Sequence, residues 1–198
     1  MSTTVAVKSL CDVVLSAFED KDYASITCFD LTKAFDCVNH DILLNKLQYY
    51  ALNNNSLLLL KSYLSNRKQF VYLNGYTSAL TDIVNGVPQG SVFGPLLFLI
   101  FINDLPHAYS NGHTVLFAGD STAINRSSDL TSLSLADKVA HESVSDWISS
   151  NKLVINTDKT QTVLCSLKPL KNRAKVKLLG IIIDSKMTWD SHVDIYFT

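Results

Sequence analysis

The sequence predicts an α+β fold in which an antiparallel sheet is backed by helices on one face. Short strand-like segments alternate with amphipathic helical segments along the chain, and hairpins are expected near its end. No repeat, low-complexity tract or interdomain linker divides the 198 residues. With 47% hydrophobic and 18% charged residues, a chain of this length can bury one substantial core.

Helices are predicted where apolar residues recur every three or four positions, and strands where short apolar runs are bounded by turn residues. The expected elements of the first half are, in order, a helix over 4–19, a strand over 24–31 that ends around Asp30, helices over 41–52 and 56–65, and a hairpin of 69–73 with 79–84 about the Asn74-Gly75 turn.

The second half begins with a tight Gly/Pro loop. The expected elements are this loop over 86–90, an apolar helix to about Leu105, a strand over 114–118 that turns at Gly119-Asp120, an amphipathic helix over 129–150, and strands over 162–165 and 176–183. The strongest apolar run, 92–102, is 11 residues long. A membrane span needs roughly 20, so a buried helix is the better interpretation.

Composition limits the possible partners and the compartment. The formal net charge is −1 and the pI about 6.5, whereas a protein that binds nucleic acid alone usually has a basic surplus. Either the partner is not nucleic acid, or the basic surfaces belong to a larger protein. The four cysteines lack metal-binding spacing and indicate reduced thiols. With no targeting signal, an intracellular location in cytoplasm or nucleus is expected.

Three segments carry residues suited to chemistry: FDLTKAFD over 29–36, GVPQGSVFGPLLF over 86–98 and LFAGDST over 116–122. Taken singly, each has an ordinary explanation, namely a capping aspartate, a strand-to-helix loop and a Gly-Asp turn. In this order they match the layout of a two-metal polymerase palm. There, aspartates from neighbouring strands hold two Mg²⁺ ions ~4 Å apart, because Mg²⁺ prefers carboxylate oxygens.

Five segments resemble, in order, the motifs of reverse transcriptases from non-LTR retrotransposons. They are DLTKAFDCVNHDIL, GVPQGSVFGPLLFLIFINDLP, LFAGDST, WISSNKLVINTDKTQTVL and, for the primer-grip hairpin and the segment after it, VKLLGIIIDSKMTWDSHV. The resemblance runs from about residue 22 to 194. It implies a partial reverse transcriptase domain over 1–198, with a palm over about 22–166 and a primer-grip-like hairpin over about 175–185. Fingers and thumb are expected to be largely missing.

The resemblance also assigns roles to individual residues. By correspondence with the family motifs, these are the metal-binding aspartates Asp30 and Asp120, the triphosphate-binding lysine and candidate general acid Lys159, the 2′-hydroxyl-blocking Phe35, the nucleotide-binding Gln89 and Gly90, and the primer-grip residues Leu179 and Gly180. The implied cofactor is Mg²⁺. The implied partners are an RNA template, a DNA primer and deoxynucleotides, with no membrane.

The chain departs from the family at Gly119, where the third motif normally has a metal-binding aspartate. A carboxylate about 4 Å from an ion contributes several kcal/mol per unit charge at an effective dielectric near 20. Since each 1.4 kcal/mol is about tenfold in rate, its loss is expected to cost orders of magnitude. Moving the alignment by one residue would make Asp120 the first ligand, but the gapless match on both sides argues against this shift.

Three functional hypotheses are compatible with these residues. The first is an RNA-directed DNA polymerase domain fragment that is catalytically impaired by Gly119. The second is a non-catalytic relic of a decayed element. The third is a domesticated palm that binds RNA or a protein partner. In the family, fingers, thumb and endonuclease lie in the same chain as the palm.

Overall fold

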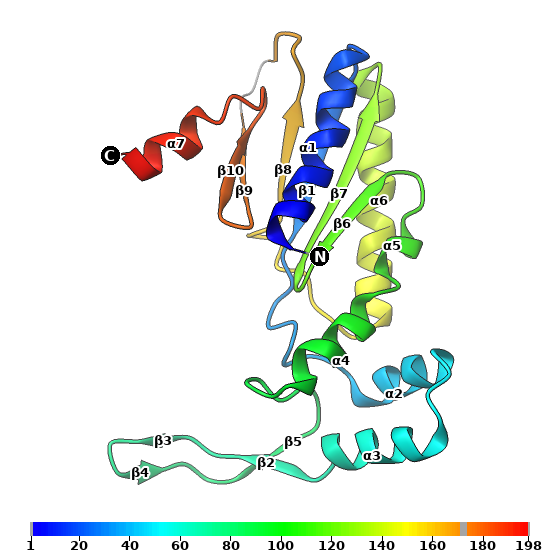
Figure 1. Cartoon of the computed structure of the whole chain (residues 1–198), viewed down its shortest axis with the longest axis vertical. Helices are drawn as coiled ribbons and strands as arrows, with labels where there is room; N and C mark the ends of the chain where they lie inside the picture. Colours follow the sequence, from blue (N-terminus) through cyan, green and yellow to red (C-terminus); the bar gives the residue numbers. More distant parts are fainter. Residues whose placement is uncertain (1, 171–173, 198) are drawn as a thin grey trace. The chain divides into compact units, whose positions relative to one another are not determined.

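A computed structural model describes residues 2–170 and 174–197, and the chain forms two compact units. The first unit comprises 1–32, 104–149 and 154–198, and the second comprises 33–103 and 150–153. The first unit contains α1 (Thr3–Glu19), β1 (Tyr23–Phe29), α5 (Leu105–Ala108), β6 (His113–Phe117), β7 (Asp120–Ser127), α6 (Leu130–Ser150), β8 (Gln161–Cys165), β9 (Lys175–Leu178), β10 (Ile181–Asp184) and α7 (Asp190–Phe197) (Figure 1).

The first unit is built on an antiparallel four-stranded sheet in the order β6-β7-β1-β8. Its central strand, β1, pairs with β7 through Phe29 and Ser121 and with β8 through Cys28 and Gln161. Five of the seven β1 residues are buried. A strand with this nearly continuous burial must be covered on both faces.

Alternate residues of β1 contact different layers. Ala24 and Ile26 pack in a core cluster with Leu10 and Val14 of α1. Ser25, on the other face, donates a hydrogen bond to Asp137 of α6. The antiparallel α+β fold is therefore confirmed, but the expectation that helices cover only one face is wrong. Figure 1 shows α1 and α6 running along the strands.

The β9–β10 hairpin joins the core on the α1 face. Val176, Leu178 and Ile183 are buried there, in the same cluster as Ile26. The turn is Leu179-Gly180, and both residues have positive φ, 50° and 84°. The pattern-based prediction of one strand over 176–183 is thus wrong, whereas the hairpin implied by the family resemblance is confirmed.

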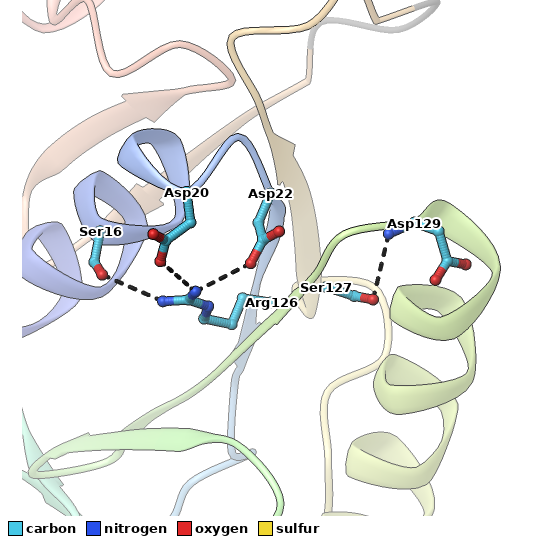
Figure 2. A network of polar contacts seen from close by, with 6 residues as sticks. All are labelled: Ser16, Asp20, Asp22, Arg126, Ser127 and Asp129. Carbon is cyan, nitrogen blue, oxygen red and sulfur yellow. Dashed lines mark hydrogen bonds and ion pairs between the residues drawn. The ribbon is translucent and has the colours of Figure 1, made fainter.

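Ion pairs and a hydrogen bond of Arg126 connect β7 to the end of α1 and to the residue before β1. The guanidinium of Arg126 lies 2.6 Å from a carboxylate oxygen of Asp20 and 3.0 Å from one of Asp22. It also donates to Ser16 Oγ at 3.2 Å (Figure 2). Arg126 and Asp20 are substantially exposed, so each ion pair contributes at most about 1 kcal/mol.

The second unit contains helices and a two-stranded ribbon. Its elements are α2 (His40–Tyr49), α3 (Asn54–Leu64), β2 (Arg67–Gln69), β3 (Tyr72–Leu73), β4 (Tyr76–Thr77), β5 (Thr81–Ile83) and α4 (Phe93–Ile102). Asn39 and Asn53 cap α2 and α3 by accepting backbone hydrogen bonds. The predicted hairpin is confirmed, with positive φ at Asn74 and Gly75 as a tight turn between twisted strands requires.

Several boundaries differ from the sequence prediction. The apolar helix ends at Ile102, and a separate short helix begins at Leu105, because Pro106 has no N–H to bond back to the preceding turn. The pattern predicted neither β7 nor α7, since polar residues interrupt the apolar run of both segments. Within the described part of the chain, no helix has the length and apolarity needed to cross a membrane.

Candidate active site

Two aspartates meet at one end of the sheet in the first unit. Asp30 directly follows β1, and Asp120 is the first residue of β7. Because Phe29 pairs with Ser121 in antiparallel register, the next position of each strand brings Asp30 opposite Asp120. Both line a cavity of about 70 Å³, whose other lining residues are Cys28, Phe29, Ser121, Thr122, Lys159, Lys177 and Leu178.

The electrostatics agree with this proximity. Burial, and then the charge of Asp30, raise the pKa of Asp120 above its usual value. Asp120 nevertheless keeps an exposed surface, so solvent screens part of the repulsion. Two carboxylates that repel one another across neighbouring strands form a site that favours a cation.

Cys28 is an unanticipated member of this cavity. Burial raises the pKa of its thiol to about 11, so the thiol stays protonated at neutral pH. Metal ligation requires the thiolate, which makes Cys28 a poor third ligand. The sequence did not indicate that Cys28 lines this cavity, because Cys28 appears there as one more residue of an apolar strand.

Lys159 reaches the cavity through a loop that is bonded to the end of β1. The backbone N–H of Asn156 donates to the carbonyl of Asp30 at 2.8 Å, and that of Thr32 donates to Val154 at 2.9 Å. Asn156 in turn accepts from the N–H of Lys159 through its carbonyl, at 3.2 Å. These bonds place the loop after α6 beside Asp30, so that Lys159 and Asp30 line one cavity.

The donor set does not fit a two-metal centre. Among residues 2–170 and 174–197, no three His, Cys, Asp or Glu side chains are arranged to hold a metal ion. The expected further carboxylate would stand at Gly119, in the two-residue turn between β6 and β7. The positive φ in this turn, 50°, belongs to Ala118 and not to Gly119. Position 119 therefore does not require glycine, and its backbone can accept an aspartate.

The nucleotide-binding residues expected from the family lie in the second unit. The Phe35 ring stacks on buried Phe98 with 4.2 Å between centroids. Gln89 Nε2 donates to Asp36 Oδ1 at 2.7 Å, and Val87 N–H donates to the Phe35 carbonyl at 2.9 Å. The loop around Gln89 is thus held against the segment that carries Phe35.

This loop depends on a glycine. Gly86 has a φ of 90°, and a Cβ there would lie 2.8 Å from the backbone oxygen of Asp36. Only glycine permits both the conformation and the close approach. Gly90 also has a positive φ, 79°, but the space beside it is open.

A larger cavity of about 780 Å³ adjoins the same loop. It is lined by three cations, two carboxylates, three amide side chains and five non-polar residues: Lys33, Asp36, Arg67, Lys68, Gln69, Asp82, Ile83, Val84, Asn85, Gly86, Val87, Pro88 and Gln89. Sequence reasoning missed it, because its cations come from segments more than thirty residues apart.

The predicted site residues therefore fall into three groups. Asp30, Asp120 and Lys159 line one cavity of the first unit. Leu179 and Gly180 form the β9–β10 turn, which is not part of that cavity's lining, although the preceding Lys177 and Leu178 are. The remaining predicted residues, Phe35, Gln89 and Gly90, belong to the second unit.

Comparison with known proteins gives concordant matches. Residues 2–183 match the family model described as reverse transcriptase (RNA-dependent DNA polymerase). The chain is 31% identical over 97% of its length to a probable RNA-directed DNA polymerase from transposon BS of Drosophila melanogaster. It is 28% identical over 90% of its length to the RNA-directed DNA polymerase from the mobile element jockey of that species. It spans 23% and 22% of these relatives, less than a quarter of their length.

Solved structures show the same fold. A telomerase from Candida tropicalis, truncated from its C-terminal domain, superposes with a TM-score of 0.65 at 16% identity, over 96% of this chain and 39% of that one. The Candida tropicalis telomerase in complex with a fragment of telomeric RNA superposes with a TM-score of 0.66 at 16% identity, over 96% of this chain and 33% of that one.

Proposed function

Because the chain belongs to the reverse transcriptase (RNA-dependent DNA polymerase) family, we propose that it is part of the RNA-directed DNA polymerase of a non-LTR retrotransposon and that Gly119 impairs its catalysis. One observation carries the proposal. Asp30 and Asp120 stand opposite each other beside Lys159, while the turn that should supply a further carboxylate carries a glycine.

The proposed substrates are those of the reaction class. An RNA template, a DNA primer and deoxynucleotides would be bound, and Mg²⁺ would be the metal. The pair Asp30 and Asp120 supports weak binding of a cation, whereas two ions need more carboxylate ligands than this cavity has. Loss of one carboxylate is expected to lower the rate by orders of magnitude.

A non-catalytic RNA-binding module is the second candidate function. The cavity of the second unit favours it, because Lys33, Arg67 and Lys68 line an open polar space large enough for a nucleotide. This function would not require the carboxylate lost at position 119.

Primer extension on an RNA template with Mg²⁺ tests the proposal. Three proteins are compared: the chain as it stands, Gly119→Asp, and Gly119→Asp combined with Asp30→Asn. We expect extension by Gly119→Asp alone, because the backbone at position 119 accepts an aspartate. The double variant tests whether any recovered activity passes through Asp30.

Each result has a distinct meaning. Steady deoxynucleotide incorporation by the chain as it stands would refute the claim that Gly119 is disabling. If neither the chain nor Gly119→Asp extends the primer, the glycine is not sufficient to explain the loss. Extension that persists in the double variant would remove Asp30 from the proposed catalytic site.

A further inference from the structure

The two-stranded ribbon of the second unit, residues 67–83, forms an arm. Within that unit it extends away from α3 as a long hairpin (Figure 1). The arm consists of two strand pairs, β2–β5 at its base and β3–β4 at its tip. Hydrogen bonds between Val71 and Ser78 connect the two pairs. An isolated two-stranded hairpin is marginally stable in water, so a persistent arm is expected to bind a partner.

The arm carries large side chains that remain exposed. Phe70 is 55% exposed, Tyr72 68% and Tyr76 82%. Val71 and Leu73 are each 67% exposed. Large apolar side chains gathered on one exposed element mark an interaction surface more often than chance exposure.

Aromatic and aliphatic side chains alternate in the first half of the arm, in the order Phe70, Val71, Tyr72 and Leu73. Within β3, Tyr72 and Leu73 point to opposite faces, and Leu73 shares its face with its pairing partner Tyr76. Phe70 and Val71 lie in the stretch between β2 and β3. The rings of Phe70 and Tyr72 are mostly exposed, so each is free to stack on a separate base of an extended single strand.

Cations lie next to the aromatic residues in the sequence, at the base of the arm. Lys68 pairs with Asp82 at 3.5 Å, and both side chains are exposed. Such a pair contributes little, so the ammonium can turn to a phosphate at low cost. Arg67 lies over the Tyr63 ring, 5.6 Å from its centroid, and lines the large cavity together with Lys33 and Lys68.

We propose that the arm binds single-stranded RNA, with bases stacked on Phe70 and Tyr72 and phosphates contacted by Lys68 and Arg67. Interleaved aromatic rings and cations are what such a strand requires. A protein partner would instead bury the aliphatic side chains of Val71 and Leu73. RNA is chosen over DNA because the proposed function supplies an RNA template as the unpaired strand, and in this respect the inference rests on that function.

Fluorescence anisotropy with an unstructured RNA of about 12 nucleotides measures the affinity. Phe70→Ala combined with Tyr72→Ala is expected to weaken binding at least about tenfold. Val71→Ala combined with Leu73→Ala, the matched control at the neighbouring aliphatic positions, is expected to change it less than about twofold. Lys68→Gln should reduce the salt dependence of binding between about 50 and about 200 mM by about one released ion.

The variants change exposed residues, and thermal unfolding checks that each keeps the fold of the parent chain. Equal RNA affinity of the parent and the aromatic double variant would overturn the proposal. So would tighter arm-dependent binding of the matching DNA oligomer. Concentration-dependent dimerisation in sedimentation, lost on changing Val71 and Leu73, would reassign the arm to a protein interface. Because no step requires polymerisation, this result is independent of the primer-extension result.

Discussion

At the scale of single residues, the protonation of Asp120 reports on the candidate site. Its pKa is raised by burial and by Asp30, so the fold disfavours the charged carboxylate. The neighbouring residue Gly119 adds no further carboxylate to the turn. A cation that compensates the remaining repulsion would be bound more weakly than in a site with three carboxylates.

The pH dependence of stability is set by the direction of this pKa shift. Below the ordinary aspartate pKa of about 3.9, Asp120 is protonated in both folded and unfolded chains, so it imposes no penalty. As the pH rises through the higher folded pKa, the folded state must release its proton and loses stability. Asp120→Asn removes the group that causes this loss. The unfolding free energy of the variant minus that of the parent chain is therefore expected to increase as the pH rises from about 4 to about 7.

Urea unfolding of both proteins across that pH range measures the difference. Asp146→Asn, at an exposed position of α6 outside the candidate site, is the matched control for the loss of one carboxylate. A gap between Asp120→Asn and its parent that is constant with pH would contradict the burial and repulsion inferred for Asp120.

At the scale of elements, a buried polar bridge holds α6 to the sheet. Asp137 accepts hydrogen bonds from Ser25 of β1 and from Asn125 of β7, the latter at 2.7 Å. Tyr109 in turn donates to Asn125. Ser25 and Asn125 are 1% and 3% exposed, so neither can turn to solvent. The bridge therefore links the two strands that carry the candidate metal-binding aspartates.

Asp137→Ala is expected to destabilise the protein by about 1–3 kcal/mol, because it leaves buried polar groups without their acceptor. Glu142→Ala, on the same helix but exposed, should change stability by less than about 0.5 kcal/mol. Chemical denaturation of the two variants makes the comparison. Similar small losses in both would mean that the bridge contributes nothing beyond ordinary surface contacts.

At the scale of the whole molecule, local stability is expected to be uneven. In the first unit, β1 is hydrogen-bonded to a strand on each side and lies between two layers. In the second unit, the arm has few buried groups, and its tip contains only two-residue strands. Regions with few buried contacts open at low free energy, whereas core strands open only with global unfolding.

Hydrogen exchange followed by mass spectrometry measures this contrast. Amides of β1 are expected to exchange slowest, and those of residues 70–80 fastest among the described strands. Addition of single-stranded RNA should slow exchange in the arm without changing β1. Strong protection of the arm in the free monomeric chain would contradict the marginal stability inferred for it.

The sequence by itself determined the α+β class, most element positions, the Asn74-Gly75 hairpin and the family motifs, because these depend on local propensity and residue order. It also placed Gly119 in a turn between two strands, where the family resemblance implies a metal-binding aspartate. Only the tertiary structure decided which distant groups meet. Strand register brought Asp30 opposite Asp120, and the loop after α6 brought Lys159 beside them.

The same distinction explains what pattern reasoning missed. Strand β7 is too polar to be recognised alone, yet it is held by pairing on both sides. Strand β1 is buried nearly throughout because α1 covers one face of the sheet and α6 the other. The positions of these two helices follow only from the tertiary structure. The cationic cavity at the base of the arm is formed by segments distant in sequence. Contacts between such segments depend on chain packing, which local sequence does not encode.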